Sequence, residues 1–209
     1  MAAETLIEDG NARIVVAAHG LVGITLSIVE RSTGIERSTV RLPYPSAGYG
    51  GHELVVSPFG RYLALFLYSG QSEVGYELFE LVPELMHVGS LPYVFGEGDH
   101  PVFSPDERWL VMAWESYLDW WSEHTTAERG RARQLDWGVL AMQQLPDGPI
   151  VRIPVQARIP AGWDPEHSSW TAPTELQFAA HDRLSLRTPW GSVPHIPFPL
   201  PADATIIVE

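Results

Sequence analysis

The sequence lacks two residue types altogether, cysteine and lysine. Without cysteine the chain can form no disulfide, no thiolate nucleophile and no cysteine-ligated zinc or iron–sulfur site. Without lysine it can form neither a P-loop of the usual type nor a Schiff base to pyridoxal phosphate. Several enzyme classes are therefore excluded before any motif is considered.

Long apolar runs are also missing. No run approaches the roughly 18 residues that a membrane-spanning helix needs. The first residues, MAAETLIEDGN, lack the basic and apolar regions of a signal peptide. We therefore expect a cytoplasmic protein with no membrane association. Its 209 residues, 45% of them hydrophobic, suffice for a sizeable core.

Positive charge is scarce, and the formal net charge is therefore −13. Residues 62–128 contain twelve acidic residues and a single arginine, Arg108, so this segment alone carries −11. An acidic surface disfavours nucleic-acid backbones and favours cationic partners. We therefore expect a basic protein partner and no nucleic acid. The alternative is that the charge serves solubility alone.

One pattern occurs twice. Residues 55–63 read VVSPFGRYL and residues 102–110 read VFSPDERWL, with Ser57 and Ser104 separated by 47 positions. This spacing lies within the roughly 40–50 residues of propeller-type repeats. Proline presets φ at the second turn position, and Gly60 can adopt a positive φ before the next strand. Each copy predicts a strand, a tight turn and a second strand.

In these residues the sequence resembles the blades of WD40-like and TolB-like β-propellers, whose first two strands often join through a Ser-Pro-Asp-Gly turn. The resemblance implies an all-β fold, either a small four-unit β-propeller or an open, propeller-like arc of antiparallel sheets. The main alternative is a β-sandwich. We expect a single domain, 1–209, with blade-like units at 4–42, 53–91, 101–156 and 175–209 and an insertion at 116–136.

Apolar runs between turn residues give the expected strands. These are 5–7, 12–18, 24–30, 36–42, 54–57, 62–68, 74–81, 85–91, 101–103, 109–115, 139–145 and 150–155. Five prolines between 189 and 201 limit the last unit to an edge or extended strand. A final strand at 205–208 is expected to close the ring against the first blade. Trp109 is expected to be buried, because it occupies the position of Tyr62.

Propeller geometry, as implied by the resemblance, places many loop aromatics on one face. Trp and Tyr side chains in such loops are typical of binding hot spots, although they could instead plug the ring. The candidate binding residues are Tyr49, His52, Tyr93, Phe95, Glu97, Asp99, Trp120, Trp121, Trp163, Trp170 and Trp190.

The loop at 96–100 offers a carboxylate and an imidazole that could perform acid–base chemistry. Asp99, His100 and a second loop histidine, His167, are the candidate catalytic residues. The sequence contains no His-Glu-x-x-His zinc motif, and we expect no metal and no cofactor.

Three functional hypotheses remain. The leading one is a non-enzymatic protein-binding module with an acidic, aromatic-rich loop face, in one form a bacterial immunity or antitoxin-like inhibitor of a basic effector. The alternative is a small hydrolase or lyase that uses Asp99, His100 and His167. The third is a subunit whose ring closes only as a homo-oligomer.

Overall fold

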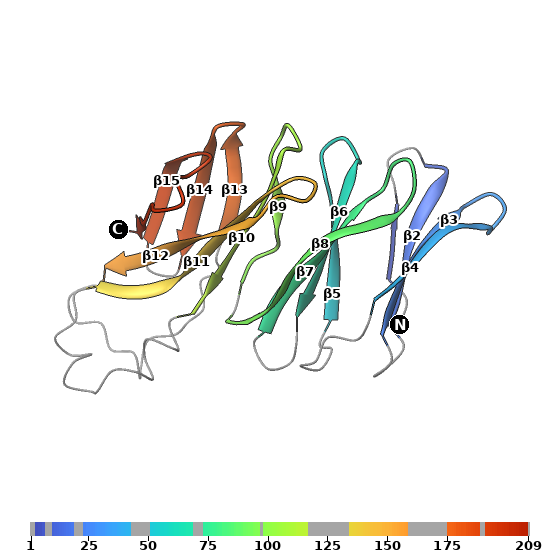
Figure 1. Ribbon diagram of the computed structural model, residues 1–209, viewed down its shortest axis with the longest axis horizontal. Helices are drawn as coiled ribbons and strands as arrows, with labels where there is room; N and C mark the ends of the chain where they lie inside the picture. The colour runs from blue at the N-terminus through green and yellow to red at the C-terminus, as the bar shows by residue number, and fades with distance from the viewer. Residues whose placement is uncertain are drawn as a thin grey trace. The chain divides into compact units, whose positions relative to one another are not determined.

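The fold is known from a computed structural model that describes residues 3–6, 10–18, 23–42, 51–68, 73–96, 98–116, 134–158, 175–188 and 191–208. In these ranges the chain forms sixteen strands in four sheets and no helix (Figure 1). The described part thus holds no helix long and apolar enough to span a membrane. The predicted all-β class is confirmed.

The first two sheets are four-stranded meanders in chain order. The first consists of β1 (Ala3–Leu6), β2 (Ala12–Ala18), β3 (Ile24–Glu30) and β4 (Glu36–Leu42). The second consists of β5 (Gly51–Val56), β6 (Tyr62–Tyr68), β7 (Glu73–Glu80) and β8 (Met86–Phe95). Strand β6 is buried on both faces from Tyr62 to Leu67, which explains its continuous apolar sequence. Both sheets have the form of propeller blades.

The third and fourth sheets contain the remaining strands, β9 to β16. The third has the order β16-β12-β11-β10-β9, and the fourth has the order β13-β14-β15. The third sheet's bounds are β9 (Val102–Phe103), β10 (Trp109–Glu115), β11 (Gln134–Gln144), β12 (Ile150–Arg158) and β16 (Ile206–Val208). Those of the fourth are β13 (Glu175–Ala180), β14 (Arg183–Thr188) and β15 (Gly191–Pro197).

The two Ser-Pro turns have the same hydrogen bonds. The hydroxyl Oγ accepts from the N–H of Tyr62 at 2.9 Å in the first turn and of Trp109 at 3.0 Å in the second. The serine carbonyl accepts from the N–H of Gly60 and of Glu107, at 2.9 Å in each turn. Both turns join the first two strands of neighbouring sheets in the order of the chain. The predicted repeat is therefore confirmed at the level of individual bonds.

Trp109 is less buried than we predicted. Tyr62 is buried, whereas Trp109 is half-buried and packs its ring edge-on against Phe198, with 5.4 Å between ring centroids. The two strand starts are equivalent in hydrogen bonding but differ in what covers them.

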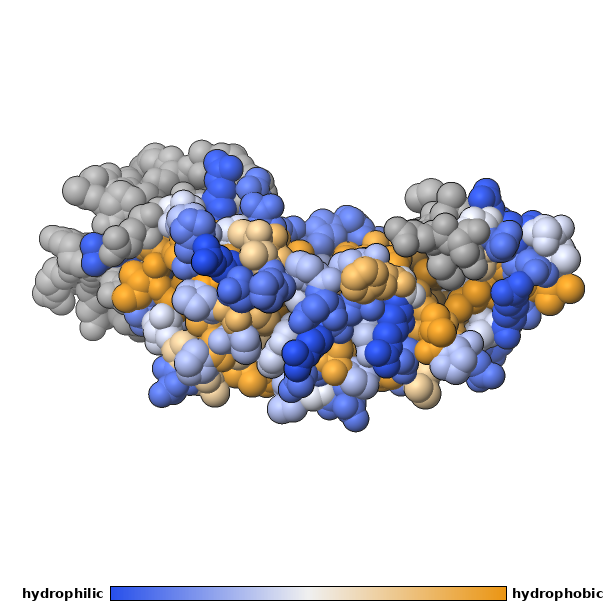
Figure 2. Space-filling model, turned by 90° about the horizontal axis from the view of Figure 1, so that it is seen from above, coloured by the Kyte–Doolittle hydropathy of each residue, from blue (hydrophilic) through white to orange (hydrophobic). Residues whose placement is uncertain are grey.

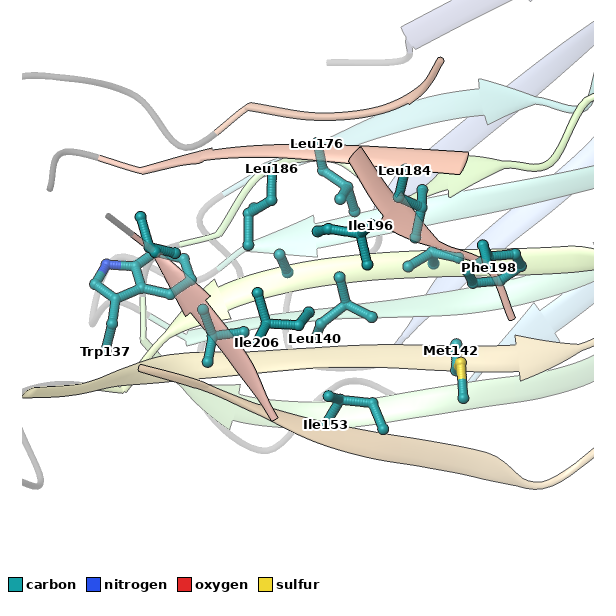
Figure 3. Close-up of a cluster of buried hydrophobic side chains, with 14 of the residues drawn as sticks. Trp137, Leu140, Met142, Ile153, Leu176, Leu184, Leu186, Ile196, Phe198 and Ile206 are labelled. Carbon is teal, nitrogen blue, oxygen red and sulfur yellow. The ribbon is translucent and has the colours of Figure 1, made fainter. Parts of the chain in front are cut away.

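The chain divides into two compact units, Met1–Val94 and Phe95–Glu209. In the first unit, apolar side chains of the first two sheets form one core, which includes Ile14, Leu26 and Leu65. In the second unit, side chains of the third and fourth sheets point toward one another, among them Leu140, Ile153 and Leu186 (Figure 3). The prediction of a single domain stays a prediction.

The last strand does not pair as we predicted. Strand β16 lies parallel to β12, with Val155 opposite Ile206, and so joins the third sheet instead of the first blade. Ile206 and Val208 are buried in the core of the second unit, which gives this pairing its driving force. The proline-rich strand β15 does lie at a sheet edge, as expected.

Candidate functional site

Many of the candidate binding residues lie outside the described part of the chain. These are Tyr49, Glu97, Trp120, Trp121, Trp163, Trp170 and Trp190, together with the candidate catalytic residue His167. Their assignment stays a prediction.

Three other candidates lie in strands instead of loops, so their predicted loop placement is wrong. His52 belongs to β5, and Tyr93 and Phe95 belong to β8. The chain becomes extended earlier at β5 and continues further at β8 than the expected ranges 54–57 and 85–91. His52 is half-buried, and burial lowers the pKa of its imidazole.

Asp99 and His100 do form a pair. The Asp99 carboxylate oxygen Oδ1 lies 3.0 Å from His100 Nδ1 and also accepts from the backbone N–H of His100 at 2.8 Å. The other oxygen, Oδ2, accepts from the backbone N–H of Leu176 at 3.2 Å. These bonds tie the loop before β9 to the first strand of the fourth sheet. The carboxylate is therefore fixed by three donors within the second unit.

Glycines let this loop lie close against strand β10. A Cβ on Gly96 would come within 1.8 Å of the Glu115 carbonyl oxygen, and its φ of +143° also favours glycine. Gly98 forms a bridge with Trp114, and a Cβ there would lie 2.9 Å from the Ala113 carbonyl oxygen. The backbone just before the pair is thus held by contacts that other residues would disrupt.

The geometry of the pair suits proton transfer. Since Nδ1 faces the carboxylate, it carries the proton in the neutral imidazole, and Nε2 is then the basic nitrogen; the tautomer follows from this bond. The side chains of His100 and Asp99 are 42% and 26% exposed, so solvent reaches both. Among the described residues, no three His, Asp or Glu side chains are grouped to hold a metal ion.

The structure also contains an acid–base pair that our sequence analysis missed. Glu77 of β7 and His87 of β8 approach to 2.6 Å between Oε2 and Nε2. One signal was present: the two residues lie in consecutive predicted strands, 74–81 and 85–91, joined by a short turn, so that they fall on adjacent strands of one sheet. We had assigned the residues to strands without pairing them.

Hydrophobic and hydrophilic residues alternate over short distances on the described part of the face in Figure 2. The large exposed hydrophobic residues in the described ranges are Ile35, Phe59, Tyr68, Val82, Met86 and Ile207. Single exposed hydrophobic residues of this kind are normal for a folded surface.

The sequence matches no protein-family model, and no curated protein matches it significantly. Solved structures do resemble it. The β-propeller domain of Swd1 from Myceliophteria thermophila has a TM-score of 0.42 at 14% identity, covering 73% of this chain and 40% of that one. The periplasmic gluconolactonase of Pseudomonas aeruginosa has a TM-score of 0.44 at 15% identity, covering 88% and 48%.

A proposed 6-phosphogluconolactonase from Bacteroides fragilis has a TM-score of 0.44 at 16% identity, covering 72% of this chain and 37% of that one. The chain thus spans about a third to a half of the length of these structures. The predicted fold-level resemblance to WD40-like β-propellers is confirmed. At these identities the likeness is one of fold alone.

The prediction of a non-enzymatic protein-binding module, including the immunity or antitoxin-like form, needs correction. Two of the neighbours named above are called lactonases, which are hydrolases, so the comparisons give the binding-module prediction no support. At this similarity they show the fold alone and assign no activity to this chain. Acidic charge and loop aromatics misled us because they describe a surface and carry no chemistry. A basic partner, self-association and a cytoplasmic location stay predictions.

Proposed function

We propose that this chain is a small hydrolase in which His100 acts as general base and Asp99 orients its imidazole. The observation that carries the proposal is the 3.0 Å contact between Asp99 Oδ1 and His100 Nδ1. A carboxylate at Nδ1 holds the ring in one tautomer and stabilises the imidazolium that forms when Nε2 accepts a proton. The same arrangement serves hydrolases on unrelated folds.

The reaction that suits this pair is attack of water on an ester or lactone carbonyl. His100 Nε2 takes a proton from the water as its oxygen bonds to the carbonyl carbon. The bond from that carbon to the alkoxy oxygen then breaks, and the imidazolium returns the proton to the departing oxygen. The products are a carboxylic acid and an alcohol, joined in one molecule when the substrate is a lactone.

The contacts that fix the position of the Asp99–His100 pair support this proposal over a role in folding alone. The contacts of Gly96 and Gly98 with β10 position the loop, and Leu176 N–H holds the second carboxylate oxygen. A base contributes most when its orientation is set before the substrate arrives. Asp99 is then a positioning residue, and His100 is the residue that touches the substrate.

The test measures hydrolysis of a nitrophenyl ester and of gluconolactone by the purified chain and its variants. His100→Gln is expected to lower kcat/KM by at least about a hundredfold, the usual contribution of a general base. Asp99→Asn is expected to lower kcat more than it raises KM. His181→Gln, at an exposed turn of the same unit, is the matched control and should leave the rate unchanged.

The pH profile separates catalysis from a structural role. An imidazole acts as a base only when neutral, so kcat/KM should fall with decreasing pH through one protonation step. If His100→Gln retains the rate of hydrolysis, the hydrolase proposal is wrong. It is also wrong if no variant changes the pH profile of kcat/KM and Asp99→Asn lowers only the melting temperature, because Asp99 then has a structural role.

A further inference from the structure

The second acid–base pair lies in apolar surroundings. On the face of the second sheet that carries Glu77, its cross-strand neighbour on β6 is Leu65, which is fully buried. The ring of His87 meets the ring of Phe79 edge-on, with centroids 5.4 Å apart. The side chains of Glu77 and His87 are 24% and 36% exposed, so each is only partly hydrated.

A carboxylate in such a place needs compensation for its lost hydration. Burial raises the pKa of Glu77, and the hydrogen bond and charge of His87 oppose this rise without cancelling it. When Glu77 is protonated, it is a neutral group that can still bond His87. When Glu77 ionises, a partly dehydrated carboxylate is left on an apolar face, and His87 compensates for this only in part.

The strand that carries His87 is the edge strand of its sheet. In the order β5-β6-β7-β8, β7 is the sheet neighbour of β8, so contacts with β7 determine how firmly β8 is held. We propose that the Glu77–His87 pair is a proton-dependent clasp that fastens edge strand β8 to β7 and loosens when Glu77 ionises.

Other titratable groups on this face modify the effect. Strand alternation places His52 of β5 and Glu73 of β7 on the same face, whereas β6 contributes Leu63, Leu65 and Leu67. Strands β2 to β4 contribute apolar side chains to the shared core. Their carboxylates have partners of their own: Glu30 bonds Thr33 and Arg37, and Glu36 bonds Ser27.

The pKa of Glu77 is raised and that of His52 is lowered, so the two groups change the stability in opposite directions as pH rises. The folded state holds the Glu77 proton more tightly than the unfolded state, so this contribution to stability is complete below the ordinary pKa of 4.5 and is lost as pH rises through the raised pKa. His52 has a lowered pKa, so its contribution is complete above the ordinary 6.5 and is lost as pH falls. Loosening of β8 at higher pH is therefore specific to Glu77.

The test is amide hydrogen exchange of the full chain between pH 4 and 8, corrected for the intrinsic pH dependence of exchange. In the wild type, protection of the β8 amides should fall relative to that of β6 as pH rises through this range. Glu77→Gln keeps the size and an acceptor for His87 but cannot ionise, so its β8 protection should not depend on pH. Glu80→Gln is the control, because Glu80 lies on the opposite face of β7 and bonds Arg61.

Titration of the Glu77 carboxyl carbon by nuclear magnetic resonance gives a second, independent measurement. A midpoint above the ordinary value for glutamate is expected. The clasp proposal is overturned if protection of the β8 amides in the wild type does not depend on pH, or if it depends on pH in the same way in Glu77→Gln. A Glu77 titration midpoint at or below the ordinary value would also overturn it.

Discussion

Glu107 occupies, in the second Ser-Pro turn, the backbone position that Gly60 occupies in the first. Their φ angles are +54° and +72°, so both lie in the left-handed region. The second turn compensates for its missing glycine through Asp106, whose carboxylate accepts from the Ser104 hydroxyl at 2.6 Å and from Arg108 N–H at 3.2 Å. Hydrogen bonding to Ser104, and then to Arg108, lowers the pKa of Asp106.

Replacing Gly60 with alanine should destabilise the first unit by about 1–2 kcal/mol, the usual penalty for a side chain in this backbone region. No atom lies within 4 Å of the Cβ that the change adds, so a clash contributes nothing. Chemical denaturation measures the loss. Glu107→Gly removes the same penalty from the second turn, and a gain or no change there would support the assignment, whereas an unchanged Gly60→Ala midpoint would contradict it.

Individual strands differ in how far their sequences predict them. Strands β6 and β10 begin and end where we predicted, because each follows a Ser-Pro turn and consists of a continuous apolar run. Strand β11 begins five residues before the expected Val139. Gly138 lies inside the strand beside a bulge, where a Cβ would come within 2.1 Å of the Trp114 carbonyl oxygen.

Long-range pairing was beyond the reach of sequence analysis. The parallel contact of β16 with β12 joins segments about fifty residues apart and leaves no local pattern. The Asp99–His100 pair could be predicted because its members are adjacent, whereas the bond from Leu176 to Asp99 joins residues 77 positions apart in the sequence. The Glu77–His87 pair required the hairpin register, which the strand assignments alone do not give.

Strand β16 should be essential to the second unit. Substituting Ile206 with alanine should cost about 2–5 kcal/mol, because the side chain is buried in the core between the third and fourth sheets. Ile207→Ala is the matched control, since Ile207 is 46% exposed in the same strand. Thermal unfolding of both variants checks this, and equal midpoints would mean that β16 does not pack as described.

At the scale of the whole chain, the described residues of each compact unit include a hydrophobic core of that unit. The first core contains residues between Ala12 and Leu85, and the second contains residues between Val111 and Val208. Burial of one large aliphatic side chain is worth about 1.5–3 kcal/mol, so each core can stabilise the unit that contains it.

A cavity in one core should therefore act mainly within its own unit. Leu65→Ala and Leu140→Ala remove equal volumes from fully buried positions in the first and second units. Hydrogen exchange should show faster local opening in residues 3–94 for the first variant and in residues 98–208 for the second. Equal loss of protection in both units from either substitution would show that they unfold as one cooperative body.

The pairing of β16 with β12 has a consequence for how the chain is made. The first two sheets are complete once residue 95 has left the ribosome, whereas the third sheet must wait for residue 208. Strand β12 is complete at residue 158, and at about 5–20 residues per second the fifty residues from there to residue 208 take on the order of 5 seconds. During that interval the nascent second unit exposes the open edge of β12 and the core positions that Ile206 and Val208 later cover, so a chaperone that binds nascent chains would find its target there.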